Sequence, residues 1–278
     1  MLDPLLVSRN GKLTDLSGLW APNPGFLVGT GPSLQLHDLS RLRERGVISL
    51  AVNNAAAVAP VRAWTFSDPQ SKFHHGLFLD PAMMTFAPEP KLGRRFVAKV
   101  DGKFRACTAK VGHCPNTFGY GRVSKFVPET FFSEKWAHWG AGKDQPKNRP
   151  LPGSLCTIFL GLRLLVYLGV KRIFLLGVDH RKGKDSVYGF PEMKKGRKGF
   201  WKEKRMWEEL KPELKRRGIE LFDVGGLCEM FPRVEFDEAV EQCKGSVPSE
   251  PFDTVGWNDK RTVVEDCKAG APLRLRWY

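Results

Sequence analysis

The residues best suited to chemistry lie between positions 24 and 34, where the sequence reads P-G-F-L-V-G-T-G-P-S-L. Residues 26–28 form a short apolar run bounded by glycines, which predicts a buried strand. Gly29 and Gly31 permit a sharp turn and a close approach of the backbone to a ligand, and Pro32 suits the first turn of a helix. Free N–H groups at a helix start favour phosphate. We therefore expect phosphate or nucleotide binding at Gly29, Thr30, Gly31, Pro32 and Ser33.

This glycine motif is incomplete as a dinucleotide fingerprint, because Leu34 stands where G-x-G-x-x-G has its third glycine. It is also not a Walker A loop, since no Gly-Lys-Ser/Thr follows. The alternative interpretation is a strand-to-helix turn that binds nothing. The order of strand, glycine turn and helix start nevertheless favours a phosphate site.

Polar residues also follow the next two apolar runs, residues 47–52 and 63–66, each of which predicts a strand. Asn53 and Asn54 come after the first run, and Ser67 and Asp68 after the second. In an open α/β sheet, ligands bind outside the carboxyl ends of the strands. Each residue taken alone could instead cap its own turn. Three successive strands ending in this way favour a shared site.

A second regular region begins at Gly153 and Ser154, which precede a strongly apolar helix that runs to Leu168. Residues 172–176 then predict a strand that ends in Gly177, Val178, Asp179 and His180. A basic segment follows. Arg181 to Arg205 holds ten Lys and Arg against three acids, a net +7, which is half of the +14 excess of the whole chain. Such clustering favours a polyanionic partner over general solubility, which is the alternative explanation.

The remaining patterns predict the other elements. We expect residues 1–23 to be loop-like with a turn at 10–11, a helix from Ser33 to Arg45 ended by Gly46, and a strand at 83–86. A hairpin is expected at 96–107, and an irregular lid or insertion at 112–152. An amphipathic helix at 201–217, a strand at 219–222 and a short helix at 236–243 complete the pattern. The expected fold class is α/β: a Rossmann-like, doubly wound, mostly parallel sheet in one GT-A-like domain. That domain spans residues 1–245, with an insertion at about 70–150 and a C-terminal tail at 246–278.

Composition sets broad limits on function. The 278 residues are 42% hydrophobic and 27% charged, with a pI near 9.6, which is ordinary for a globular protein except for its basicity. No apolar run is long enough to span a bilayer, and a signal-peptide core is lacking. The six cysteines follow no disulfide framework, so we expect a cytoplasmic protein. Cys107, His113 and Cys114 lack a fourth zinc ligand at a familiar spacing, and no Asp-x-Asp pair follows a strand, so no metal is expected.

Two stretches of this sequence resemble conserved motifs of a known protein family. The motif G-T-G-P-S-L (29–34) is similar to the G-N-G-P-S-L of bacterial sialyltransferases of glycosyltransferase family 42. The block L-G-V-K-R-I-F-L-L-G-V-D (168–179), with Ser186 to Tyr188 after it, resembles their second conserved region. Similar blocks occur in related uncharacterised phage and bacterial proteins and in archaeal 6-hydroxymethylpterin diphosphokinases. The resemblance covers about residues 24–68 and 153–224, and it implies fold more strongly than reaction.

The resemblance also implies roles for single residues. Residues 29–33 would hold the nucleotide phosphates or ribose. Asn53 matches the asparagine that meets the nucleotide, and Ser154 matches the serine of the family's S-G-V start, although here the glycine precedes it. Asp179 and Tyr188 fall where nucleotide and phosphate contacts cluster. The general-base histidine that the family has within the region matching residues 196–202 is absent here. The base is therefore left open among His180, Asp68 and Asp179. Our candidate catalytic residues are His180, Asp179, Tyr188 and Asp68, and the candidate nucleotide-binding residues include Asn54, Ser154 and Gly177.

The expected function is a metal-independent glycosyltransferase with a nucleotide sugar as donor. Its acceptor would be a polyanion such as hydroxymethylated phage DNA, or alternatively a lipid or glycan sugar at an anionic membrane surface. The acceptor would contact the cations of the basic segment, Arg181, Lys182, Lys184, Lys194, Lys195, Arg197 and Lys198. The alternatives are a pterin-type pyrophosphokinase or kinase that uses ATP and Mg²⁺, and a non-catalytic nucleic-acid-binding protein of the same fold.

Overall fold

The computed structural model describes residues 6–7, 13–74, 76–100, 103–114, 116–121, 126, 128–132, 156–179, 200–225 and 230–244. Several sequence-based expectations concern residues beyond these ranges. They are the turn at 10–11, residues 133–152 of the lid proposed for 112–152, residues 181–199 of the basic segment 181–205, and the tail at 246–278.

A nine-stranded sheet forms the centre of the described fold, in the order β11-β10-β3-β4-β5-β6-β9-β1-β2. Its first seven strands are parallel to one another. They are β11 (Glu220–Asp223), β10 (Arg172–Leu176), β3 (Gly25–Val28), β4 (Ile48–Val52), β5 (Ala63–Thr65), β6 (Met84–Pro88) and β9 (Thr117–Tyr120). Two short antiparallel strands, β1 (Leu6–Val7) and β2 (Leu13–Thr14), complete the far edge. This arrangement confirms the α/β class and the mostly parallel sheet.

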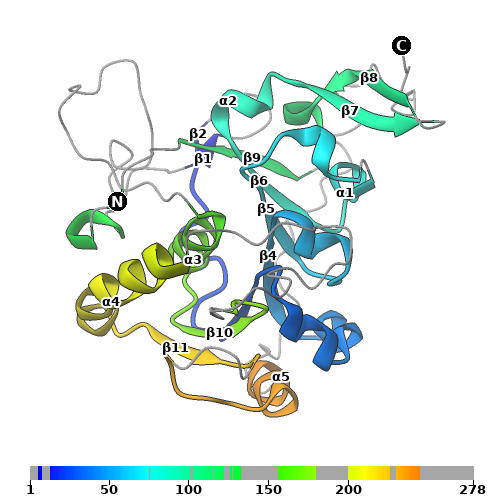
Figure 1. Ribbon diagram of the computed structural model, residues 1–278. Helices are drawn as coiled ribbons and strands as arrows, with labels where there is room; N and C mark the ends of the chain where they lie inside the picture. The colour runs from blue at the N-terminus through cyan, green and yellow to red at the C-terminus, as the bar shows by residue number, and fades with distance from the viewer. Residues whose placement is uncertain are drawn as a thin grey trace.

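Helices cover both faces of the sheet, so its central strands are apolar on both sides, as in other parallel sheets. On one face α3 (Thr157–Tyr167) and α4 (Phe200–Arg216) pack against residues such as Leu27 and Leu50. On the other face, Phe26 and Ala51 pack in a second cluster with residues of shorter helices. These are the 3-10 helices η1 (Pro32–Leu36), η2 (Leu39–Arg43) and η3 (Asn53–Ala57), with α1 (Gly76–Leu79) and α5 (Phe236–Lys244). Figure 1 shows α3 and α4 on one side of the strands and the short blue and cyan helices on the other.

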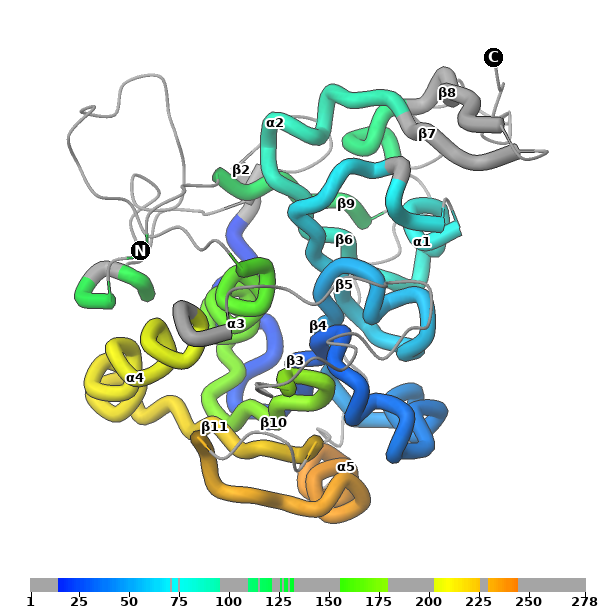
Figure 2. The backbone as a smooth tube through the Cα atoms, in the orientation of Figure 1, coloured from blue at the N-terminus to red at the C-terminus, as the bar shows by residue number. Residues whose placement is uncertain are grey.

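The chain reverses its direction across the sheet at β3. From β3 it proceeds through β4, β5, β6 and β9 to one side, then returns to β10 on the other side of β3 and continues to β11. The helix after β3, η1, lies on one face, and the helix after β10, α4, lies on the other. Such a reversal is a topological switch point, where α/β proteins bind ligands outside the carboxyl ends of the two strands. Figure 2 shows β3 and β10 next to each other.

Several predicted elements are confirmed. Strand β10 has the bounds predicted from the sequence, and β3, β4, β5, β6 and β11 agree within about two residues. Helices α4 and α5 are also found where the periodicity predicted them, and the described part of α3 begins at Thr157. The predicted hairpin is β7 (Arg95–Val100) paired with β8 (Lys103–Lys110). Gly46 adopts the left-handed conformation expected of a residue that ends a helical segment, at φ 89°.

The prediction of one helix from Ser33 to Arg45 was wrong. The segment forms two separate 3-10 helices, η1 and η2, because His37 between them is extended, at φ −130° and ψ 150°. Asp38 then begins η2, since its carboxylate accepts hydrogen bonds from the backbone N–H and the hydroxyl of Ser40 at 3.0 and 2.6 Å. Aspartate favours a helix start over a helix interior for this reason.

Two segments expected to be irregular contribute to the main sheet. The N-terminal region, predicted as a loop, supplies β1 and β2, and its Trp20 is fully buried. Residues 70–150, expected as an insertion, supply β6 and β9 as well as the hairpin. They also form η4 (Gln70–Lys72), α2 (Glu89–Leu92), η5 (Val111–His113) and η6 (Pro128–Thr130). Within the described ranges, the helices are all too short or too polar to cross a lipid bilayer.

A network of ion pairs fastens η2 to α5. The Arg41 guanidinium contacts Glu44, Asp237 and Glu241 at 2.8, 2.5 and 2.6 Å, and Lys244 Nζ lies 2.6 Å from Glu44 Oε2. Hydrogen bonds from Arg41 and then Lys244 lower the pKa of Glu44 to about 2. The pKa of Glu241 is also lowered by hydrogen bonds, of which the one from Lys244 has the largest effect and the one from Arg41 the next largest. The network therefore favours both carboxylates in their charged form.

We expect this network to make stability depend on acid pH. A carboxyl group whose pKa falls on folding stabilises the protein above its unfolded pKa, near 4.5 for Glu44, and this contribution is lost as pH falls through the folded value near 2. Arg41→Met should therefore melt at a lower temperature than wild type at pH 7. This difference in melting temperature should become smaller as the pH falls from about 4.5 to 2. The effect should also weaken at high salt, because the groups lie near the surface. Thermal melts measured across pH provide the test.

Arg43→Met is the matched control, since Arg43 is exposed on the same helix and has no ion pair with the described residues. Its melting temperature should follow that of wild type at every pH. If the difference in melting temperature between wild type and Arg41→Met stayed constant down to pH 2, that result would contradict the assigned role of the network.

Candidate functional site

The carboxyl ends of β3 and β10 meet closely at the switch point. Gly29 N–H donates to Leu176 O and Gly31 N–H donates to Gly177 O, both at 2.7 Å. A Cβ atom at Gly29 would lie 2.3 Å from the carbonyl oxygen of Gly177. At Gly31 it would lie 2.4 Å from Asp179 Oδ2. The two glycines of the motif are therefore required for the contact between two strand ends.

Asp179 and Ser33 connect the same two strand ends through side-chain hydrogen bonds. Ser33 N–H donates to Asp179 Oδ2 at 2.7 Å, and the Ser33 hydroxyl donates to Oδ1 at 2.6 Å. Ser33 is fully buried and Asp179 is 7% exposed. Gly225, just after β11, leaves room for this pair, because a Cβ atom there would lie 2.4 Å from Ser33 Oγ. A carboxylate from the segment just after β10 thus caps the start of η1, where helix donors favour negative charge.

This arrangement differs from the expected one, in which the N–H groups of residues 29–33 bind a phosphate directly. The N–H groups of Gly29, Gly31 and Ser33 already donate within the chain, and Pro32 has none. A phosphate oxygen could reach the Ser33 N–H only by displacing the Asp179 carboxylate. In this structure Asp179 occupies the place that the sequence suggested for an anionic ligand.

A second polar cluster lies at the ends of β4 and β5. Asn53, at the end of β4, has the left-handed φ of 50°, which is uncommon for a residue with a side chain. Its amide donates to Thr157 Oγ1 at 3.2 Å and accepts from Ser67 N–H at 3.1 Å. The hydroxyls of Ser67 and Thr157 also hydrogen-bond to each other. Asn53 therefore joins β4, β5 and the start of α3 at one point on the carboxyl edge.

Lys91 adds a positive charge to this edge. Its ammonium group donates to the carbonyl oxygen of Ser67 at 2.6 Å and to that of Asp68, and it lies 5.2 Å from the centre of the Phe66 ring. The Asp68 carboxylate itself is 39% exposed and lies 3.3 Å from Lys72 Nζ. Lys91 thus holds the turn after β5, while the Asp68 carboxylate remains accessible to solvent.

The structure gathers the described candidate residues into two neighbouring groups. Residues 29–33 lie with Gly177 and Asp179, and Asn53 lies with the Ser67–Asp68 turn. Because β3 and β4 are paired, the two groups sit side by side, at about the 4.8 Å spacing of adjacent strands. Thr30 and Asn54 are half-buried at the same edge. The candidates outside the described residues are His180, Tyr188, Ser154, Arg181, Lys182, Lys184, Lys194, Lys195, Arg197 and Lys198.

Sequence reasoning missed two residues of this edge, Thr157 and Lys91. Thr157 begins α3 and could have been found as a hydroxyl residue near the predicted helix start at 153–154. Lys91 lies in α2, a helix of four residues that gives no periodic signal. It reaches the site only because β6 places α2 beside the end of β5.

His37 is a described histidine near Asp179, and its environment makes it a packing residue. Burial lowers its pKa, outweighing the opposite effect of Glu235, Asp237 and Asp179, so the imidazole is neutral at pH 7. Its ring lies 4.9 Å from that of Phe236, and its Nε2 atom is buried without a hydrogen-bond partner among the described residues. An enclosed nitrogen of this kind is not accessible to a substrate hydroxyl.

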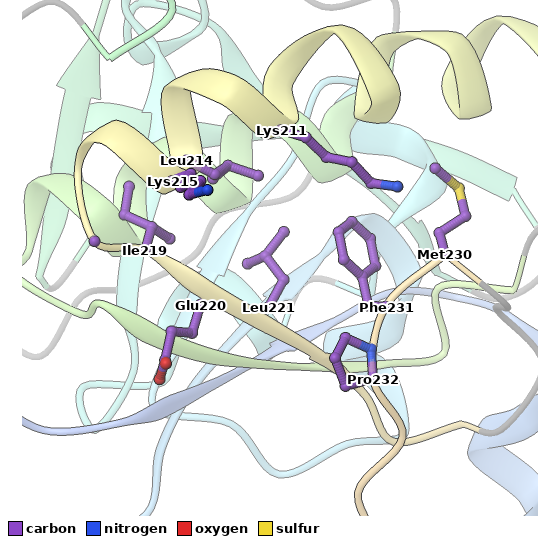
Figure 3. Close-up of a pocket in the computed structure, with 10 residues that line it drawn as sticks. Lys211, Leu214, Lys215, Ile219, Glu220, Leu221, Met230, Phe231 and Pro232 are labelled. Atoms are coloured by element: carbon purple, nitrogen blue, oxygen red, sulfur yellow. The ribbon is translucent and has the colours of Figure 1, made fainter.

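Two further features of the described residues bear on ligand binding. Those residues contain no group of three or more His, Cys, Asp and Glu side chains placed to hold a metal ion. A hollow of about 440 Å³ lies between α4 and the start of β11 (Figure 3), but Leu214, Leu221 and Phe231 make its walls largely apolar. Comparison with protein-family models, with curated proteins and with solved structures found no match.

The close contact at the glycines makes a testable prediction about folding. Gly29→Ala should destabilise the protein by about 1–3 kcal/mol, because the added methyl group meets backbone rather than a movable side chain. Gly93→Ala is the matched control, since Gly93 has a helical conformation and nothing lies within 4 Å of a Cβ atom there. Denaturant unfolding of both variants measures the difference. Equal stability of Gly29→Ala and wild type would contradict the geometry described for the switch point.

Proposed function

We propose that this chain is a metal-independent glycosyltransferase that uses a nucleotide sugar as donor. The observation that carries the proposal is the convergence of Ser33, Asn53, Ser67 and Asp179 at the carboxyl edge, beside the topological switch point. This is the location at which α/β proteins bind nucleotides. The strained backbone of Asn53 adds support, because such conformations concentrate at functional sites.

The donor would bind over this edge through side chains more than through free backbone N–H groups. A carboxylate only accepts hydrogen bonds, so Asp179 suits the hydroxyl groups of a ribose better than a phosphate. The ammonium group of Lys91 donates to the carbonyl oxygens of Ser67 and Asp68, and a positive charge there would stabilise a departing phosphate. In this proposal Asp179 positions the donor and fixes the two strand ends.

The acceptor hydroxyl requires a general base, and Asp68 is the described residue that best fits this role. Its carboxylate is partly exposed at the end of β5, whereas Asp179 is buried and bonded to Ser33. A base must reach the proton that it removes. His180, which lies outside the described residues, remains the alternative from the sequence. The acceptor is proposed to be a polyanion, with the basic segment 181–205 in contact with it.

One observation favours a second function, that of a non-catalytic nucleic-acid-binding protein of the same fold. The Asp179 carboxylate fills the anion position at the start of η1, as a residue would in a protein that no longer binds a nucleotide there. The two functions differ in one measurable property. A transferase must bind a nucleotide sugar, whereas the non-catalytic protein binds nucleic acid alone.

Isothermal titration calorimetry tests the proposal, with CMP-, UDP- and GDP-sugars in buffer containing EDTA and with ATP in parallel in buffer containing Mg²⁺. We expect one class of nucleotide sugar to bind with one-to-one stoichiometry. Asn53→Gly should weaken binding about tenfold, because glycine keeps the left-handed backbone but removes the amide hydrogen bonds. The control Gly93→Ala should bind like wild type. Binding and turnover of ATP alone would favour the pyrophosphokinase, and binding of no nucleotide would favour the non-catalytic protein.

A further inference from the structure

The β7–β8 hairpin forms a two-stranded sheet of its own, separate from the main sheet. Its strands have six and eight residues, so β8 is about 26 Å long at the usual rise of a strand. It follows α2, and Figure 1 shows the two strands extending away from the main sheet beside that helix. The register shifts between Arg95 and Val97, an irregularity that increases the twist of such a ribbon.

This ribbon carries a concentrated positive charge. Residues 94–110 contain six basic side chains, Arg94, Arg95, Lys99, Lys103, Arg105 and Lys110, against the single acid Asp101, a net +5. The basic segment 181–205 holds a further +7, so these two segments account for +12 of the chain's +14. The other 236 residues are almost neutral as a whole. The positive charge of the protein is therefore local.

The cations at the base of the ribbon are exposed and unneutralised. Arg94, Arg95 and Lys110 form no ion pair within the part of the chain that the structure describes. Helix α4 shows the contrast, because its Arg205, Lys211 and Arg216 pair with Glu209, Glu208 and Glu213. Charges left without carboxylate partners on a projecting element are available to an anionic ligand.

We propose that the β7–β8 hairpin is an arm that binds double-stranded nucleic acid in its major groove. That groove is about 12 Å wide in B-DNA and admits a two-stranded β-ribbon. By the backbone register, Lys99 is paired with Phe104, whereas Arg105 and Lys103 are paired with Ala98 and Val100, so basic positions occur on both faces of the ribbon. A groove has phosphates along both walls and so meets cations on both faces, whereas a flat membrane surface would meet only one.

The inference goes beyond the proposed transfer reaction, since binding by this arm requires no donor nucleotide. It assigns a second polyanion-binding surface besides the basic segment 181–205. Counterion release makes such binding fall with salt, with a slope of log K against log salt of about −0.9 per phosphate contact. Each cation of the ribbon that contacts a phosphate should contribute to this slope.

Fluorescence anisotropy with a labelled 25-base-pair duplex of unmodified DNA, without nucleotide, tests the arm. Two triple variants are compared, one at the base (R94Q, R95Q, K110Q) and one further along the ribbon (K99Q, K103Q, R105Q). The control (R43Q, R45Q, K171Q) removes three exposed cations of the main body that also lack ion pairs with the described residues. Each hairpin variant should bind at least tenfold more weakly near 0.1 M salt, with a slope reduced by about 2 to 3. The control should retain wild-type affinity.

Thermal melts of all three variants establish that they are folded. Unchanged duplex affinity in folded hairpin variants, or an equal loss in the control, would overturn the proposal. The same variants are then tested on vesicles that contain phosphatidylserine. Loss of vesicle binding with retention of duplex binding would overturn it in favour of a membrane surface. Because no nucleotide sugar is present, the result does not depend on whether the transfer reaction is correct.

Discussion

The buried bond between Asp179 and Ser33 fixes the geometry of the candidate site. A charged carboxylate is costly to bury unless hydrogen bonds satisfy it, and here the N–H and the hydroxyl of Ser33 both donate to it. The two residues are 146 positions apart in the chain, so the bond joins the first parallel strand to the strand that returns beside it. The close approach of Gly29 and Gly31 to residues 177–179 follows from the same contact. Replacing either glycine by a larger residue would separate the two strand ends.

The same principle governs the neighbouring group around Asn53. There too, a side chain at one strand end satisfies backbone and hydroxyl groups that belong to other elements. The polar groups described at the carboxyl edge consequently hydrogen-bond to one another, and few of the described backbone N–H groups there are left for a ligand. Among the described residues, a ligand over this edge would meet carboxylate, amide and hydroxyl oxygens together with the ammonium groups of Lys72 and Lys91. Such a surface suits a ligand with several hydroxyl groups, and the sugars of a nucleotide sugar are ligands of that kind.

The sequence predicted the parts of the fold whose residues interact mainly with their immediate neighbours. Strand β10 is a continuous apolar run, and α4 has a clear helical period, so both were located from the sequence. The strands β1 and β2 have only two residues each, and they are strands only because β1 pairs with β9 and β2 pairs with β1. Likewise, Gly31 and Asp179 were both singled out as candidates, but their mutual contact could not be predicted. It depends on the return of the chain to β3, which no local pattern encodes.

The positions of the two basic segments connect the site with the hairpin. The segment 181–205 begins just after the carboxyl end of β10, and the hairpin begins after α2, which follows the carboxyl end of β6. Between β10 and β6 lie β3, β4 and β5, so the carboxyl ends of β10 and β6 are about 19 Å apart at the usual strand spacing. That distance corresponds to about five or six base pairs of DNA. A duplex held by both segments would pass over the ends of β3, β4 and β5, which carry Ser33, Asn53 and Asp68. The distribution of charge and the position of the candidate site are thus consistent with one extended polyanion lying across the carboxyl edge.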